Sequence, residues 1–88
     1  MLNNDFLIIN KLGLHARASA LFVKTASQFK SDVKLAKETV EVNGKSIMGI
    51  MMLAAAKGTT VTLTVDGEDE ELAMQAIGDL IKNGFGEE

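Results

Sequence analysis

Apolar residues recur along the chain at helical spacing in three places. A stripe at spacings of four, four and three predicts an amphipathic helix over residues 16–29. Its members are Ala18, Phe22, Ala26 and Phe29. A second stripe predicts a helix over residues 69–83, with an acidic first turn and a C-terminal Asn-Gly. Its members are Ala73, Ala76, Ile77, Leu80 and Ile81. The segment IMGIMML, residues 47–53, predicts a short helix between them.

Four other segments have the pattern of strands. Apolar and threonine positions alternate over residues 59–66, which places Val61, Leu63 and Val65 on one face. Residues 33–37 and 40–42 also alternate across a two-residue link, which predicts a hairpin. A short β-rich apolar segment at residues 5–10 predicts a first strand.

The predicted order is β-α-β-β-α-β-α over a single domain, residues 1–88. The threonine and charged faces of two strands are typical of an antiparallel sheet with one solvated side. The long helices each have one apolar face, which the other side of the sheet covers. We therefore expect an α+β open-faced β-sandwich, in which a four-stranded antiparallel sheet has helices packed on one face. A helical connection between the first two strands leaves a gap there for the fourth strand.

Composition excludes several classes of function. The 88 residues contain no Cys and one His, so disulfide and thiol chemistry are absent and a zinc site is disfavoured. A net charge of −3 and the absence of Trp and Tyr argue against nucleic acid as a partner. No apolar run is long enough for membrane insertion, and no secretory leader is visible. We expect a cytoplasmic protein without a metal or other cofactor.

The single histidine, His15, lies at the predicted start of the first helix, between Gly13 and Arg17. Backbone N–H groups are unpaired at a helix N-terminus, and the helix dipole places partial positive charge there. The ring is therefore expected to be largely neutral and nucleophilic. A dianion attached to it would be bound by the N–H groups of Ala16 and Arg17 and by the Arg17 guanidinium. These properties suit a histidine that accepts a phosphoryl group and passes it on.

A simpler interpretation stays open at this point. A lone histidine before a helix is commonly a polar surface residue or a modest cap, and Arg17 could be an ordinary surface charge. No third residue is placed by spacing to complete a Ser-His-Asp arrangement.

A predicted apolar surface adds to the functional interpretation. On a helical wheel Leu21 falls on the outer side of the first long helix, near the histidine end. The short second helix carries more apolar surface than one side can bury. Its crowded residues are Ile47, Met48, Met51 and Met52. An exposed patch of this kind, rimmed by basic residues, is typical of docking to several partners, although core packing is the alternative for any single Met. The basic residues are Arg17, Lys24 and Lys45.

The segments GLHARASALFVKTASQF and VNGKSIMGIMMLAAAKGTTVTLTVDG closely resemble HPr, the histidine-containing phosphocarrier family of the bacterial phosphoenolpyruvate–sugar phosphotransferase system. The resemblance covers nearly the whole chain. It implies that His15 accepts a phosphoryl group on Nδ1 from phosphorylated enzyme I and donates it to IIA domains, with Arg17 stabilising the group. The protein would be a covalent carrier and not an enzyme. The implied docking residues are Leu14, Ala20, Leu21, Lys24, Lys45, Ile47, Met48 and Met51.

Ser46 has two compatible interpretations. As a helix N-cap it accepts an N–H from Met48 or Gly49. The resemblance also implies phosphorylation by an HPr kinase/phosphorylase, and a phosphate there would add charge within the docking patch and weaken binding of enzyme I.

The chain departs from the family at one place, since Ala18-Ser19 replaces a common Pro-Ala after the arginine. Alanine is an excellent helix former and leaves one more free N–H, so we expect tuning of the site and not loss of function. Two alternatives remain, a nitrogen-branch phosphocarrier and a small binding module with a structural histidine. We expect a monomer, because such a carrier offers one face to successive partners. The sugars served are set by those partners.

Overall fold

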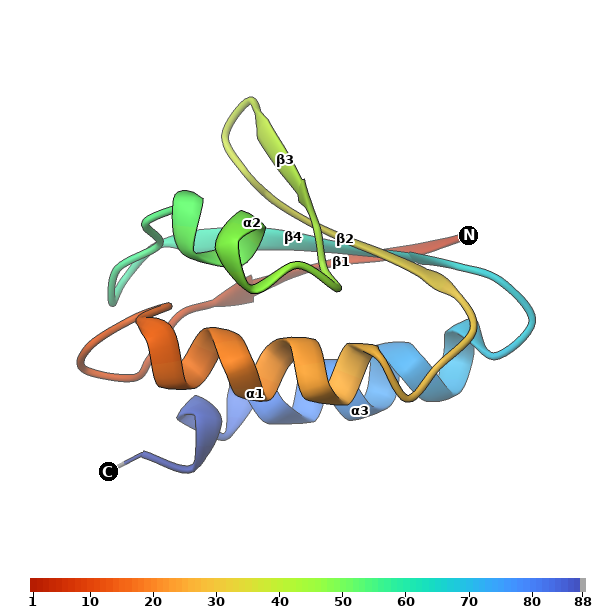
Figure 1. Cartoon of the computed structure of the whole chain (residues 1–88). Coiled ribbons are helices and arrows are strands. Elements are labelled where there is room, and N and C mark those ends of the chain that lie inside the picture. The colour runs from red at the N-terminus through yellow and green to blue at the C-terminus, as the bar shows by residue number, and fades with distance from the viewer. Residues whose placement is uncertain (88) are drawn as a thin grey trace.

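The computed structural model describes residues 1–87, and position 88, the last of the predicted domain, lies outside the described residues. Four strands form one sheet, and helices pack against one of its faces (Figure 1). The predicted α+β fold and the order of its main elements are confirmed. In chain order the elements are β1 (Leu2–Leu7), α1 (Ala16–Ala26), β2 (Asp32–Lys37), β3 (Val40–Asn43), α2 (Ile47–Met52), β4 (Thr60–Asp66), α3 (Glu70–Lys82) and the 3₁₀ turn η1 (Gly84–Gly86).

The sheet is antiparallel throughout, in the order β1-β4-β2-β3. β4 therefore fills the gap that the β1-α1-β2 connection leaves, as the sequence predicts. Val65 pairs with Leu2 of β1 and with Val33 of β2, and Leu63 lies one step along the same face. This register places the alternating apolar side chains of neighbouring strands together on the buried face.

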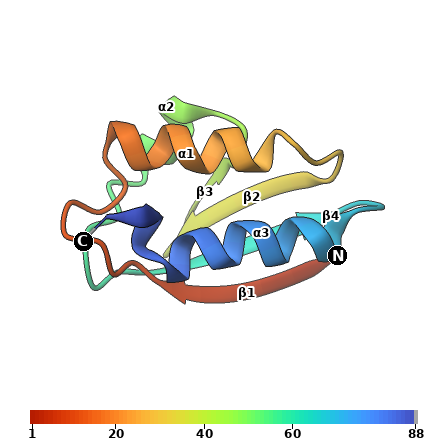
Figure 2. The same ribbon diagram turned by 90° about the horizontal axis from the view of Figure 1, so that it is seen from below.

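The core lies between that face of the sheet and the helices α1 and α3, which run side by side beneath it (Figure 2). Phe22 of α1, Ile77 of α3 and Leu63 of β4 are all fully buried in this core. The sequence stripes identify these faces correctly, and Met74 is a buried residue they do not include. No helix within residues 1–87 combines the length and the apolar character needed to cross a membrane.

The largest differences from the sequence prediction lie at the first strand, which also begins earlier, at Leu2, at the end of the first helix and in the segment after α3. The first strand ends at Leu7, because Ile8 exchanges hydrogen bonds with the segment before β4 and the chain then turns away. The first helix ends at Ala26, where Phe29 donates its N–H to the Ala26 carbonyl in a tighter turn than the α-helix. After α3 the chain forms η1, which no periodic pattern in so short a segment indicates.

Asp69 joins the α1–β2 loop to the start of α3. One carboxylate oxygen accepts hydrogen bonds from the Ser31 hydroxyl (2.5 Å) and N–H (2.9 Å), and the other accepts the Lys30 N–H at 2.8 Å. The hydrogen bond from the Ser31 hydroxyl, followed by the one from Lys30, lowers the pKa of Asp69 to about 2. The ionised carboxylate is therefore the form that stabilises this junction.

The Asp69 junction predicts a specific loss of stability in acid. Because the folded pKa is depressed, its contribution is fully present above the unfolded value of 3.8 and is lost as pH falls toward about 2. Urea unfolding of wild type and Asp69→Asn should therefore differ by a constant amount above pH ~4. We expect that difference to shrink between pH ~4 and pH ~2. A difference that does not vary with pH would contradict this assignment.

Candidate functional site

His15 is the N-cap of α1, as the sequence predicts. Its backbone is extended and the helix begins at Ala16. The ring nitrogen Nδ1 accepts a hydrogen bond from the Arg17 N–H at 3.3 Å. The backbone N–H groups of Ala16 and Ala18 have no hydrogen-bond partner within residues 1–87, as expected for the first turn of a helix. The Arg17 N–H is thus already hydrogen-bonded to the ring, while the N–H groups of Ala16 and Ala18 are available to bind an anion.

The loop before His15 is anchored to the segment after α2. Leu14 donates its N–H to the Ala55 carbonyl at 2.9 Å, and Gly13 lies against the same carbonyl with φ of +65°. The Leu14 side chain is only 5% exposed and belongs to the core. The prediction that Leu14 contributes to an exposed docking surface is therefore wrong, because its side chain fixes the loop from inside.

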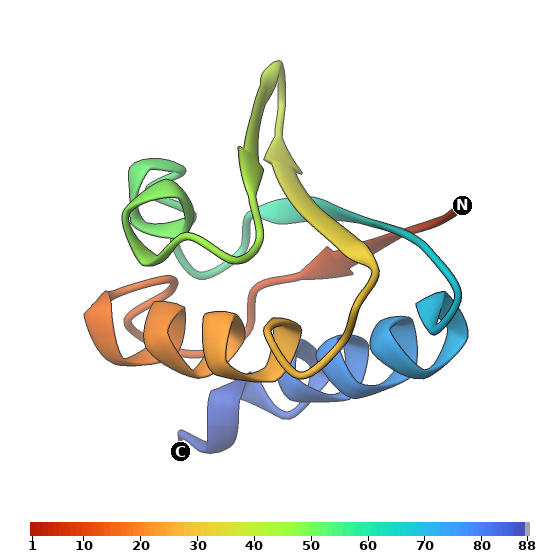
Figure 3. The ribbon, with the colours of Figure 1, turned by 45° about the vertical axis from the view of Figure 1, so that its right-hand side comes forward.

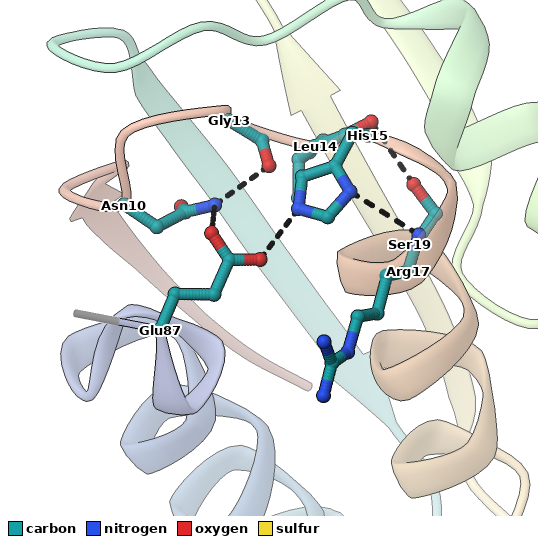
Figure 4. Close-up of polar contacts among 7 residues, drawn as sticks. All are labelled: Asn10, Gly13, Leu14, His15, Arg17, Ser19 and Glu87. Carbon is teal, nitrogen blue, oxygen red and sulfur yellow. Dashed lines mark hydrogen bonds and ion pairs between the residues drawn. The ribbon is translucent and has the colours of Figure 1, made fainter.

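Glu87 contacts the other nitrogen of the imidazole. Its Oε2 lies 2.5 Å from Nε2 of His15, and its Oε1 accepts a hydrogen bond from Nδ2 of Asn10 at 3.2 Å (Figure 4). The same Asn10 amide donates to the Gly13 carbonyl at 2.7 Å. The hydrogen bond with His15 is the main cause that lowers the pKa of Glu87, and Asn10 adds to it. The imidazole is thus held through both of its nitrogens.

Glu87 is a site residue that the sequence patterns do not indicate, since 72 residues separate it from His15. It is brought there by η1, where Gly84, Phe85 and Gly86 all have positive φ. The Phe85 side chain is buried, which fixes the tail beside α1 and α3. The two glycines flanking an aromatic residue are a signal for a tight turn, but they do not indicate what the next side chain contacts.

An open pocket of about 380 Å³ surrounds the imidazole, lined by Lys11, Leu12, His15, Arg17 and Glu87. Two of these side chains are cationic, and the N-terminus of α1 adds partial positive charge. The Arg17 side chain extends away from the ring in Figure 4 and forms no ion pair within residues 1–87. The pocket is therefore suited to a small anion attached to the ring.

Ser46 caps α2 as the sequence predicts. Its Oγ accepts the Gly49 N–H at 3.0 Å, which selects one of the two predicted partners. α2 lies beside α1 and contacts it (Figure 3). The apolar residues of α2 are largely exposed, as the crowding argument expects: Ile47 is 43%, Met48 74%, Met51 41% and Met52 74% exposed.

Around these residues the predicted surface differs in two details. Ala20 and Lys24 are exposed as expected, whereas Leu21 is half-buried and packs partly against the core. Lys45 is also half-buried, because its ammonium donates a hydrogen bond to the Phe29 carbonyl at 2.8 Å. Leu21 is therefore not the fully solvent-facing residue that the helical wheel indicates. We call Ala20, Leu21, Lys24, Lys45, Ile47, Met48 and Met51 the α1–α2 surface.

An α+β sandwich that presents a capped imidazole in an open cationic pocket fits the class of small carrier proteins. The family model "PTS HPr component phosphorylation site" matches residues 2–83. The phosphocarrier protein HPr of Neisseria meningitidis is 63% identical over 87 residues, covering 99% of this chain and 98% of the relative. That of Cupriavidus necator is 58% identical with the same coverage. The chain belongs to the HPr family, and its role is that of a phosphocarrier of the phosphotransferase system.

Solved structures support the same assignment. The crystal structure of HPr-C-His from Thermoanaerobacter tengcongensis is 51% identical in sequence and has a TM-score of 0.96. The match covers 100% of this chain and 99% of that chain. An HPr dimer from the same organism is 50% identical with a TM-score of 0.79, covering 99% of this chain and 100% of that one. The likeness extends over the whole fold.

Proposed function

We propose that His15 takes a phosphoryl group on Nδ1 from phosphorylated enzyme I and donates it to IIA domains of the phosphotransferase system. The observation that carries the proposal is the position of Nδ1 at the N-terminus of α1, beside unpaired N–H groups and Arg17, while Nε2 is held by Glu87. In each transfer the Nδ1 lone pair forms the new N–P bond as the bond between phosphorus and the donor breaks. The protein carries the group and turns over only with its partners.

The surroundings of Nδ1 supply the stabilisation that such a transfer needs. Phosphoryl transfer depends mainly on in-line positioning and on neutralising the charge of the phosphoryl oxygens. The free N–H groups of Ala16 and Ala18 lie in the first turn of α1, where they can donate hydrogen bonds to the phosphoryl oxygens. The Arg17 N–H can do the same once Nδ1 is bonded to phosphorus. The Arg17 guanidinium forms no ion pair within residues 1–87, so it is free to turn toward the phosphoryl group.

The proposed docking site for enzyme I and IIA domains is the α1–α2 surface, which lies beside the imidazole. Its exposed Met51 and Met48 adapt to different partner surfaces because methionine side chains are flexible and polarisable. Lys24 supplies a positive rim. We infer that residues 1–88 form a single domain and that the working form is a monomer. An HPr dimer exists among the related structures, so sedimentation at working concentration is the check.

The test of this function uses phosphoenolpyruvate and enzyme I. We expect the wild-type protein to gain the mass of one phosphoryl group, which is labile in acid and stable in base, and to lose it on addition of a IIA domain. The matched control omits enzyme I. Failure of enzyme I to phosphorylate the folded protein would overturn the proposed function.

Ser46 is proposed as a regulatory phosphorylation site for an HPr kinase/phosphorylase. Its Oγ lies at the start of α2 within the proposed docking region, and a phosphate there gains from the free N–H groups of the helix end. The added charge would raise the cost of covering this surface with a partner. Phosphorylation of Ser46 would therefore reduce transfer from enzyme I to His15.

The Ser46→Asp variant is predicted to weaken enzyme I binding, measured as a higher KM in phosphoryl uptake. The Ser46→Ala variant should keep that KM but lose about 0.5–2 kcal/mol of unfolding free energy with its N-cap. Thr39→Asp is the matched control, since Thr39 lies exposed in the β2–β3 turn and adds the same charge elsewhere. Equal KM values for Ser46→Asp and Thr39→Asp would contradict the regulatory role.

A further inference from the structure

We propose that Glu87 is a positioning residue for phosphoryl transfer, whose carboxylate holds the imidazole proton on Nε2 of His15 and leaves the lone pair on Nδ1. This inference rests on the proposed function of His15 and adds a residue to it. It assigns a chemical role to the C-terminal tail, which lies at the opposite end of the chain from the histidine motif.

Two independent contacts select the same tautomer of the ring. A neutral imidazole carries one N–H and one lone pair. The Arg17 N–H points at Nδ1, so Nδ1 must be the acceptor. At the other nitrogen, the Glu87 carboxylate accepts but does not donate, so the proton in the 2.5 Å contact comes from Nε2. The low pKa of Glu87, caused mainly by this hydrogen bond, keeps the carboxylate ionised.

This tautomer is the one that phosphoryl transfer through Nδ1 requires. As the Nδ1 lone pair bonds to phosphorus and the donor bond breaks, the ring becomes an imidazolium, with positive charge shared by the Nε2–H. The Glu87 carboxylate stabilises that charge directly. When the phosphoryl group moves on, the N–P electron pair returns to Nδ1, and the group left behind is neutral imidazole. No proton has to enter or leave the ring in either direction, and Glu87 acts as the buried aspartate does in a Ser-His-Asp triad.

The carboxylate is itself held in place by buried groups. Asn10 is buried, and its amide nitrogen faces two acceptors, the Glu87 Oε1 and the Gly13 carbonyl. The reversed orientation would direct the amide oxygen at both acceptors, so the donor orientation is fixed. One side chain thus joins the tail carboxylate to the loop that carries His15. The buried Phe85 anchors the other end of this contact.

The first test is spectroscopic and needs no partner protein. Long-range ¹H–¹⁵N spectra of the single histidine, recorded where the ring is neutral, report which nitrogen carries the proton. In wild type we expect the Nε2–H tautomer to dominate, and in Glu87→Ala we expect a mixture of both tautomers. Glu87→Gln retains an acceptor oxygen and should retain the Nε2–H tautomer. Glu68→Ala is the matched control, because Glu68 is an exposed carboxylate in the turn before α3.

The second test is kinetic. Glu87→Ala should lower kcat/KM for uptake from enzyme I roughly 10-fold or more, the size of loss seen when a carboxylate that orients a metal-ligating histidine is removed. Glu87→Gln should fall between Glu87→Ala and wild type, since it orients the ring without compensating its charge. A wild-type ring protonated on Nδ1, or a Glu87→Ala protein with unchanged tautomer and rate, would overturn the inference. The tautomer measurement tests whether Glu87 sets the protonated nitrogen, and it does so even if wild type takes up no phosphoryl group. Absence of uptake by wild type would overturn only the proposed function.

Discussion

Replacing His15 is expected to abolish phosphoryl uptake completely, because the chain holds no second imidazole. We favour His15→Asn as the test variant. Asparagine is among the best N-cap residues, so its side chain can accept the Arg17 N–H that Nδ1 accepts in wild type. The variant therefore removes the nucleophile while keeping the start of α1. Mass measurement after incubation with phosphoenolpyruvate and enzyme I should show only the unmodified protein.

The interpretation of His15→Asn depends on an intact docking surface. The variant should compete with wild type for enzyme I with an unchanged inhibition constant, because the α1–α2 surface is untouched. His15→Ala serves as the second variant, which loses the cap as well and should unfold at lower urea concentration. An acid-labile phosphoryl group on either variant would show that another residue is the acceptor.

Gly13→Ala is expected to have the largest effect on stability of any single methyl addition in the site. A Cβ at this position would lie 2.4 Å from the Ala55 carbonyl oxygen and 2.8 Å from the Ala56 Cα. Left-handed backbone costs about 1–2 kcal/mol for an alanine, and overpacking against fixed backbone costs about 1–3 kcal/mol. Together we expect a loss of about 2–5 kcal/mol in the free energy of unfolding.

Gly58→Ala is a control that separates strain from collision. Gly58 also has positive φ (+90°), but a Cβ there would have no atom within 4 Å. It should lose only the backbone term of about 1–2 kcal/mol. Gly13→Ala should also slow phosphoryl uptake, since the same loop places His15, whereas Gly58→Ala should not. Equal losses of stability for the two variants would contradict the collision with Ala55.

The site residues that can be predicted from the sequence are those whose contacts lie within a few residues along the chain. His15 and Ser46 are predictable as N-caps because a cap depends on the backbone of the next few residues. The alternation of Val61 and Leu63 likewise identified the buried face of β4, since strand periodicity is local. The helical wheel predicts a solvent-facing Leu21, whereas this residue of α1 is half-buried, because a wheel does not show how closely neighbouring elements approach.

Contacts between distant segments were outside the reach of pattern analysis. Leu14 is predicted as a docking residue, yet the loop turns it into the core beside the segment that contains Ala55. Glu87 was not identified because nothing in its local sequence refers to residue 15. Its position depends on the left-handed turn at Phe85 and on burial of that ring where η1 contacts α1 and α3.

By itself, then, the sequence determined the elements, the fold class and the place of His15 at the start of a helix, because hydrophobic periodicity and helix capping are properties of short segments. The tertiary structure alone decided how the imidazole of His15 is held at both nitrogens, by Arg17 on one side and Glu87 on the other. The physical reason is that a carboxylate 72 residues away becomes a partner only when burial of apolar side chains elsewhere brings the two chain segments together.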